Sequence, residues 1–328
     1  MKKSTLAGLA MLMLAASGTP AMAQNEIYDF SGFTDSGLLK LFYNALQNGR
    51  KYPTMEEFEA AGIQASDIAF VRSHVRRAEI MSRADRLVPT TYETRNLWAN
   101  LPMDVGSGGD AGYPGSKFAA DVYSLWQYTN LFGSWNHSIF QAPGCWVDAA
   151  HRNGTDIFSG IKFFESWTAG SGDAAYTKLI TEKDGNGNFK YVEPLINCLM
   201  YFGSDGINYN WEDSSYSDED CTAFHKQLYK KAAEQGFLNF HAGIYTANST
   251  LSAGNADALF GNSETGRTFD LMLNYSGGDF SYGIGSSVTA AENAMGTAEG
   301  LYTGVWIVGM DRRWTALDEN PQAHKCGV

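Results

Sequence analysis

From about residue 91 onward, short apolar runs of strand type alternate with longer runs of helical type. The predicted strands are residues 97–101, 122–128, 156–164, 205–210, 238–245, 269–274 and 302–308, and the predicted helices are residues 143–153, 191–202, 218–235 and 288–299. This alternation is typical of βαβ units that build a parallel sheet. Seven strands with connections of this size favour closure, so the sequence predicts an α/β protein with a (β/α)8 TIM-type barrel over residues 91–328.

Residues 24–90 lack this alternation and predict an N-terminal helical region. Apolar residues recur at helical spacing between Leu38 and Leu46, and residues 55–61 follow Pro53-Thr54, which suits the start of a helix. A third helix, rich in arginine, is expected over residues 65–84. No chemistry is evident here, so this region is expected to pack on the barrel or to form a small module.

The first 23 residues contain the parts of a secretory signal peptide in their usual order. Lys2 and Lys3 form a basic start, residues 6–16 are apolar, and Ala21-Met22-Ala23 is a small-x-small cleavage site ahead of Gln24. The alternative, a buried N-terminal helix, explains fewer of these features. We therefore expect a secreted or periplasmic protein, and no later run of about 20 apolar residues predicts a membrane span.

The chain is acidic, with 24 Lys and Arg against 36 Asp and Glu and a net charge of −12. Loss of residues 1–23, which contain two lysines and no acid, would make it more negative. Nucleic acids and anionic lipids are bound by clustered Lys and Arg. The charge therefore argues against a nucleic-acid partner, and it leaves the oligomeric state open.

The four cysteines do not have the spacing of a zinc site. Export permits disulfides, and Cys198 and Cys221 flank residues 205–212, which makes them the favoured pair, with buried thiols as the alternative. Asp184-Gly-Asn-Gly-Asn188 imitates the start of a calcium loop but has Phe189 where that loop needs glycine, so a tight turn is the better account. No metal or organic cofactor is predicted.

Residues 205–212 read Asp-Gly-Ile-Asn-Tyr-Asn-Trp-Glu and follow an apolar run of helical type. Alternate side chains of a strand share a face, so Asn208, Asn210 and Glu212 point the same way, while Tyr209 and Trp211 pack behind the strand. Glu212 then lies at the carboxyl end, where barrel enzymes place their chemistry. A carboxyl group with an amide two residues before it suits hydrolysis of an N-acetylhexosaminide assisted by the substrate's own acetamido group.

At these residues the sequence resembles the endo-β-N-acetylglucosaminidases of glycoside hydrolase family 85. The Asp-Gly-x-x-x-Asn-x-Glu pattern of that family falls on Asp205, Gly206, Asn210 and Glu212. Three further blocks, residues 146–164, 269–275 and 302–309, resemble the family in the same order, so the resemblance covers about residues 95–311. The related family 18 chitinases have acids in the middle of their pattern, where this chain has Asn208 and Asn210.

Two departures from the family pattern stand out. Trp306 occupies a position where the family usually has Asp. The chain also ends soon after the seventh strand, where the family has an eighth strand and helix, so the barrel is expected to lack its last strand and helix. Truncation is the favoured explanation. An eighth strand supplied by the N-terminal region or by another chain is the alternative.

The resemblance implies a substrate-assisted, retaining mechanism, an exception to the usual pair of carboxylates. Glu212 would protonate the departing oxygen, the acetamido oxygen would attack C1 to give an oxazoline, and Glu212 would then activate water. Asn210 would hydrogen-bond the acetamido nitrogen. The candidate substrate-binding residues are Asn208, Trp126, Tyr245, Asn274, Tyr275 and Trp306, and for Tyr245 and the tryptophans core packing is the alternative.

The predicted function is hydrolysis of the GlcNAc-β-1,4-GlcNAc core of N-linked glycans. A chitinase-like enzyme of family 18 type and a non-catalytic glycan-binding protein are the two alternatives.

Two nearby polar residues are expected to have structural roles. Asp205 is expected to bond the backbone of the barrel, and His151 to cap a helix or lie on the surface.

Overall fold

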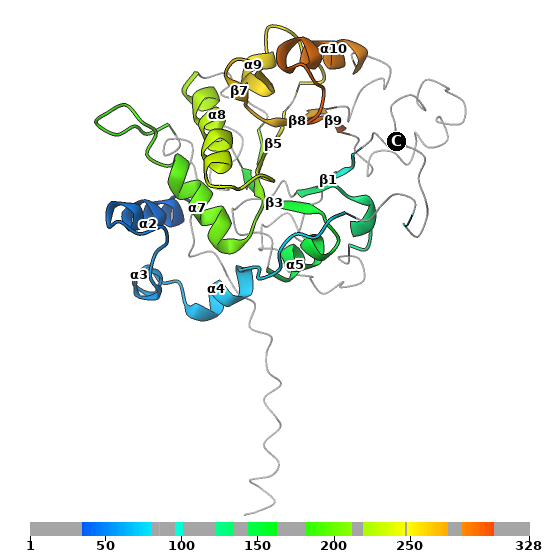
Figure 1. The fold of residues 1–328 in the computed structure, drawn as a ribbon. Helices are drawn as coiled ribbons and strands as arrows, with labels where there is room; N and C mark the ends of the chain where they lie inside the picture. The colour runs from blue at the N-terminus through cyan, green and yellow to red at the C-terminus, as the bar shows by residue number, and fades with distance from the viewer. Residues whose placement is uncertain are drawn as a thin grey trace, which may run out of the picture. The chain divides into compact units, whose positions relative to one another are not determined.

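A computed structural model describes residues 35–80, 85, 96–100, 123–133, 144–162, 181–211, 219–246, 248–274 and 284–304, with only the backbone at residues 159–162, 210 and 274 (Figure 1). All of these residues lie in one compact unit, residues 31–328. The predicted signal peptide, Glu212, Tyr275 and Trp306 lie outside the described residues. The predicted domain boundaries at residues 23 and 90 stay predictions.

Seven parallel strands form one sheet, in which chain order and spatial order agree. They are β1 (Trp98–Asn100), β2 (Leu131–Gly133), β3 (Asp156–Lys162), β4 (Gly206–Asn210), β5 (His241–Tyr245), β8 (Asp270–Asn274) and β9 (Leu301–Gly304). A two-stranded hairpin, β6 (Gly261–Asn262) and β7 (Gly266–Arg267), is inserted between β5 and β8. The α/β class and the parallel sheet are confirmed, and closure of the described strands into a (β/α)8 barrel stays a prediction.

Helices alternate with these strands and lie on the outside of the sheet in Figure 1. They are α5 (Gly144–Arg152), α7 (Val192–Phe202), α8 (Glu219–Glu234), α9 (Ala256–Leu259) and α10 (Ile284–Met295). One face of the sheet packs under them, as in the cluster of Phe132, Ile157 and Val147 beneath α5. The opposite face carries a second cluster made by Trp98, Leu131, Phe158 and Met272. Both faces are therefore buried, which explains why the strands are so apolar.

The predicted second strand, residues 122–128, is wrong. Residues 126–128 form a 3-10 helix, η3 (Trp126–Tyr128), and the strand is instead the buried run Leu131–Gly133. The aromatic rings of Tyr123 and Trp126 pack on Phe132 and Trp146 and so lie over the sheet rather than in it. The predicted helix at residues 288–299 is displaced, since α10 begins and ends four residues earlier.

The N-terminal region is helical in its first half, as predicted. The helices are α2 (Asp35–Gln47), α3 (Met55–Ala60) and α4 (Ala65–Val71). Thr54 begins α3 with a capping box that involves Glu57, which satisfies backbone donors at the start of this short helix. Phe42 and Phe58 are fully buried and contact Phe202 of α7, so these helices are held to the unit by an aromatic cluster.

The third helix is shorter than expected, because residues 73–80, here called the strap, have no regular secondary structure. The Ser73 N–H donates to the Phe202 carbonyl at 2.9 Å and the Ala78 N–H donates to the His151 carbonyl at 2.8 Å. Arg72, which ends α4, has extended backbone angles. The strap therefore gains hydrogen bonds from α5 and α7 that a continued helix would forgo.

A glycine lies beneath the strap where its backbone passes closest. A Cβ at Gly154 would lie 2.4 Å from Ile80 Cα, well inside van der Waals contact. Gly154 also has a φ of +75°, which L side chains rarely adopt. The Asn153-Gly154 turn after α5 is thus shaped by the segment that crosses it.

Two smaller predictions are also decided. The disulfide between Cys198 and Cys221 does not form, and both residues are buried thiols. The tight turn at residues 184–188 is confirmed, because Asp184 Oδ1 accepts the N–H groups of Asn186 and Asn188 at 2.8 and 2.9 Å. These bonds hold the pKa of Asp184 below its usual value, and they occupy its carboxylate within the turn.

Candidate active site

β4 carries the central part of the predicted motif, and its side chains alternate as expected. Tyr209 and Trp211 are almost completely buried and pack against Phe269, on the face covered by α8. This confirms that they lie behind the strand. Asn208 is also fully buried on the opposite face, and its Nδ2 donates to Asn100 Oδ1 of β1 at 3.1 Å. An amide pair from two strands therefore lies below the position of Asn210.

Strand register brings three of the predicted residues to neighbouring strand ends. Asn210 ends β4 directly beside Tyr245, which ends β5, and Asn274 ends β8. The Trp211 N–H continues the pairing by donating to the Tyr245 carbonyl at 2.9 Å. Because all these strands are parallel, the three residues share the carboxyl edge of the sheet. By alternation Glu212 would follow on the same side as Asn210.

An aromatic platform lies beneath this edge. Trp98 and Phe158 pack edge to face with ring centroids 5.3 Å apart, and Tyr302 meets Trp98 at the same distance. Tyr245, half-buried, packs against the same cluster. Trp98 and Phe158 were not among the site residues predicted from the sequence. The available signal was the alternation of Trp98 with Asn100, which puts both on one face of β1.

Glycines make room for this platform. A Cβ at Gly243 would lie 2.8 Å from the Trp98 ring and 3.1 Å from the Phe158 ring. A Cβ at Gly133 would lie 2.6 Å from Phe158. The small residues on β2 and β5 thus face the large ones on β1 and β3, which is how close packing is reached between strands.

Trp126 does not belong to this group. It precedes β2 and so lies at the amino end of that strand, and the Thr155 hydroxyl, just before β3, donates to its carbonyl at 3.0 Å. Its ring packs on Tyr123, Phe132 and Trp146. Trp126 is therefore not at the carboxyl edge, and its packing supports the alternative to substrate binding, a role in the core.

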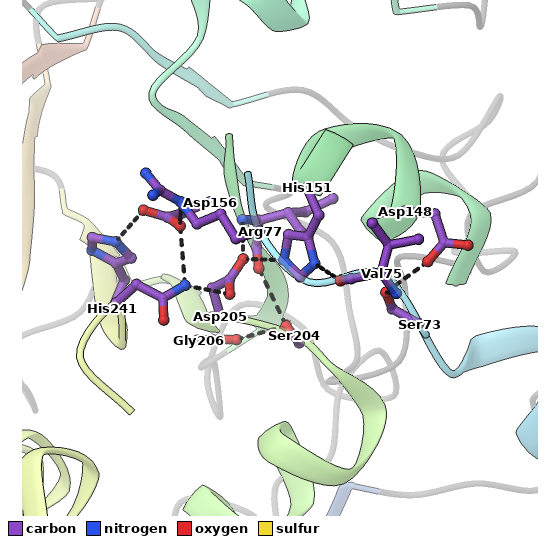
Figure 2. Close-up of polar contacts among 12 residues, drawn as sticks. Ser73, Val75, Arg77, Asp148, His151, Asp156, Ser204, Asp205, Gly206 and His241 are labelled. Atoms are coloured by element: carbon purple, nitrogen blue, oxygen red, sulfur yellow. Dashed lines mark hydrogen bonds and ion pairs between the residues drawn. The ribbon is translucent and has the colours of Figure 1, made fainter. Parts of the chain in front are cut away.

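The amino edge of the sheet carries a separate buried polar network, drawn in Figure 2. Asp156, His241 and Asp270 begin β3, β5 and β8, and Asp205 immediately precedes β4. The Asp205 carboxylate accepts the Ile157 N–H at 2.8 Å and the Asn239 amide at 2.6 Å. The prediction that Asp205 bonds the backbone of the sheet is confirmed.

His151 links this network to the strap. Its Nδ1 lies 2.6 Å from the Val75 carbonyl and its Nε2 lies 2.8 Å from Asp205 Oδ2 (Figure 2). A carbonyl can only accept, so Nδ1 carries a hydrogen, and one further proton is shared between Nε2 and the carboxyl group. The expectation of a helix cap or surface residue is wrong, since His151 is buried between two segments.

His241 contacts a carboxylate with each of its ring nitrogens. Nε2 lies 3.2 Å from Asp156 Oδ2 and Nδ1 lies 2.8 Å from Asp270 Oδ2. Burial alone would lower the pKa of this imidazole, but the two carboxylates outweigh burial and raise the pKa to about 10. Arg77 of the strap forms an ion pair with Asp156. The network is therefore a set of balanced charges at the end of the sheet that barrels use for stability.

A cavity of about 660 Å³ lies elsewhere, between α10 and residues 250–256. Its lining consists of small apolar side chains, hydroxyl groups and an amide, as in Leu251, Thr289 and Asn293. None of the lining residues that the structure describes titrates near neutral pH, so these residues supply no general acid or base. Within the described part of the chain, no helix is long and apolar enough to cross a membrane.

Comparison with known proteins agrees with this geometry. Residues 110–255, which include β2 to β5, match the profile of glycosyl hydrolase family 85. No curated protein was found to match the chain. Among solved structures, the glycoside hydrolase domain of Endo-D from Streptococcus pneumoniae R6 is similar, with 16% identity and a TM-score of 0.50. The similarity covers 72% of this chain and 38% of that one, and at this identity it bears on the fold alone. The resemblance to glycoside hydrolase family 85 that residues 205–212 indicate is therefore confirmed.

Proposed function

We propose that the chain is an endo-β-N-acetylglucosaminidase that hydrolyses the β-1,4 bond between the two core GlcNAc residues of N-linked glycans. The observation that carries the proposal is the placement of the motif. Residues 206–210 of the motif form β4, and Asn210 at its carboxyl end lies directly beside Tyr245 of β5. The family 85 match spans both strands. Trp98 and Phe158 are buried beneath this edge of the sheet and support the strand ends from below rather than offering a surface to the substrate.

The reaction would need a single carboxyl group. Glu212 donates its proton to the glycosidic oxygen as the C1–O bond breaks, and the acetamido oxygen forms a new bond to C1. Asn210 accepts a hydrogen bond from the acetamido nitrogen and so orients that group, while Tyr245 borders the same position. Glu212 then takes a proton from water as the water attacks C1, which reopens the oxazoline with net retention. Asn274, Tyr275 and Trp306 would contact the sugars on either side.

Two further features belong to the proposal. We propose that the seven strands are part of a (β/α)8 barrel, because consecutive parallel strands in unbroken chain order are the arrangement of that fold. We also propose export through a cleaved signal peptide at residues 1–23, because this segment has a basic start, an apolar run and a small-x-small site. N-linked glycans of glycoproteins would then be reached outside the cytoplasm.

Mass spectrometry of a high-mannose glycoprotein, incubated with the mature chain or with Glu212→Gln, tests the reaction. The parent chain should leave one GlcNAc on each glycosylated Asn, and the variant, which has no acid to donate, should leave the glycan intact. GlcNAc oligomers released from chitin would favour the chitinase-like alternative. Glycan binding by both proteins without cleavage by the parent would favour the non-catalytic alternative.

A further inference from the structure

His225 of α8 lies directly behind β4, the strand that ends at Asn210, and it is fully buried. Its ring is enclosed by aromatic side chains, with centroids 4.4 Å from Phe269, 5.1 Å from Tyr209 and 6.4 Å from Trp211. An apolar side chain would fill such a cage without the cost of burying a polar group. We therefore expect the imidazole of His225 to be kept here for the hydrogen bonds that it makes.

The hydrogen bonds of His225 define that role and fix its tautomer. Nδ1 lies 2.7 Å from the Cys221 carbonyl, which can only accept, so Nδ1 carries the hydrogen. Burial lowers the pKa of His225 to about 3, against a small opposing effect of the Cys221 carbonyl, so the ring is neutral at ordinary pH. Nε2 is therefore a bare acceptor, and the Tyr209 hydroxyl, 2.9 Å away, donates to it.

The hydrogen bond between Tyr209 and His225 acts on the active-site side of β4 through the backbone of the strand. Tyr209 is adjacent to Asn210 in the strand, and Trp211, which packs in the same cage, lies between Asn210 and Glu212. β4 ends at Asn210, and the N–H of the next residue, Trp211, donates to the Tyr245 carbonyl. The anchoring of the outward side chains at positions 209 and 211 thus holds the strand backbone on both sides of Asn210.

We infer that His225 is a positioning residue, which acts through the Tyr209 hydroxyl to hold the β4 backbone at Asn210 in place for acetamido-assisted hydrolysis. The inference rests on the proposed function and adds a residue to it. Tyr209 and His225 do not touch the substrate. Their effect should fall on kcat rather than KM, because displacing a reacting group by about 1 Å can cost up to about 100-fold in rate.

A set of variants of the mature chain tests this with the high-mannose glycoprotein as substrate. Tyr209→Phe and His225→Phe should each lower kcat about tenfold with KM nearly unchanged, and the double variant should be no slower than His225→Phe. His225→Gln should recover most of the loss, because its amide oxygen can accept the Tyr209 hydroxyl near the position of Nε2. Rescue by this variant distinguishes positioning from simple packing.

Tyr229→Phe is the matched control. Tyr229 is in the same helix and is half-buried, but its hydroxyl accepts the Ala242 N–H at 3.0 Å and contacts Asp270 at the amino edge of the sheet. This variant should lose stability and keep the parent kcat. If Tyr209→Phe and His225→Phe also keep the parent kcat, the inference is overturned while the proposed function stands. An inactive parent chain would overturn both.

Discussion

At the scale of single residues, His241 makes stability depend on pH. Its folded pKa of about 10 lies above the ordinary value of about 6.5, so the folded state holds a proton that the unfolded state releases. The resulting stabilisation is complete below pH 6.5 and is lost as the pH rises toward 10. We expect the free energy of unfolding to fall with pH by up to about 1.4 kcal/mol per unit from this residue.

Urea unfolding between pH 6.5 and 8.5, below the range where Lys and Tyr titrate, measures this slope. His241→Gln keeps a donor for one carboxylate but carries no charge, so its unfolding free energy should fall less steeply with pH. His74→Gln, at an exposed histidine of the strap, should keep the slope of the parent. Equal slopes for the parent and His241→Gln would show that His241 is not held protonated.

At the scale of elements, the strap depends on the glycine beneath it. Gly154→Ala would introduce a Cβ 2.4 Å from Ile80 Cα at a φ of +75°. Gly187→Ala has almost the same φ, +82°, but its Cβ would meet nothing within 4 Å. Backbone strain of about 1 kcal/mol is therefore common to both variants, and the clash should add about 1–3 kcal/mol to Gly154→Ala alone.

Denaturant unfolding gives the two stabilities, and hydrogen exchange shows whether the strap is displaced. The Ala78 amide, which donates to the His151 carbonyl, should exchange faster in Gly154→Ala and at the parent rate in Gly187→Ala. Two variants that are equally destabilised and equally protected at Ala78 would mean that the strap does not press on Gly154.

The strap also marks the limit of what the sequence could predict. The apolar periods located six of the seven sheet strands, and residues 205–212 indicated β4 with its inward amides, because alternation along a strand is a local property. Residues 73–80 continued a helical pattern, but bonds to α5 and α7 were stronger than that local preference. His151 was misjudged for the same reason, since its partner Asp205 is distant in sequence.

At the scale of the whole molecule, the two edges of the sheet have separate tasks. Oppositely charged groups form ion pairs at the amino edge, and the proposed chemistry lies at the carboxyl edge, as in barrel enzymes generally. Asp156→Asn at the amino edge would remove the charge that balances His241 and Arg77. Tyr245→Phe at the carboxyl edge would remove one hydroxyl group next to Asn210.

One substitution should therefore change mainly stability, and the other should change mainly kcat. Asp156→Asn should lower the free energy of unfolding by about 3 kcal/mol, the cost of breaking a buried ion pair, and leave kcat unchanged at temperatures where the variant is folded. Tyr245→Phe should lower kcat by about tenfold to 100-fold and change stability by about 0.5 kcal/mol or less. Urea unfolding and initial rates at saturating glycoprotein, measured on both variants, check the separation. A loss of kcat in folded Asp156→Asn would mean that the charge network reaches through the strands to the proposed site, so that stability and catalysis share one set of contacts.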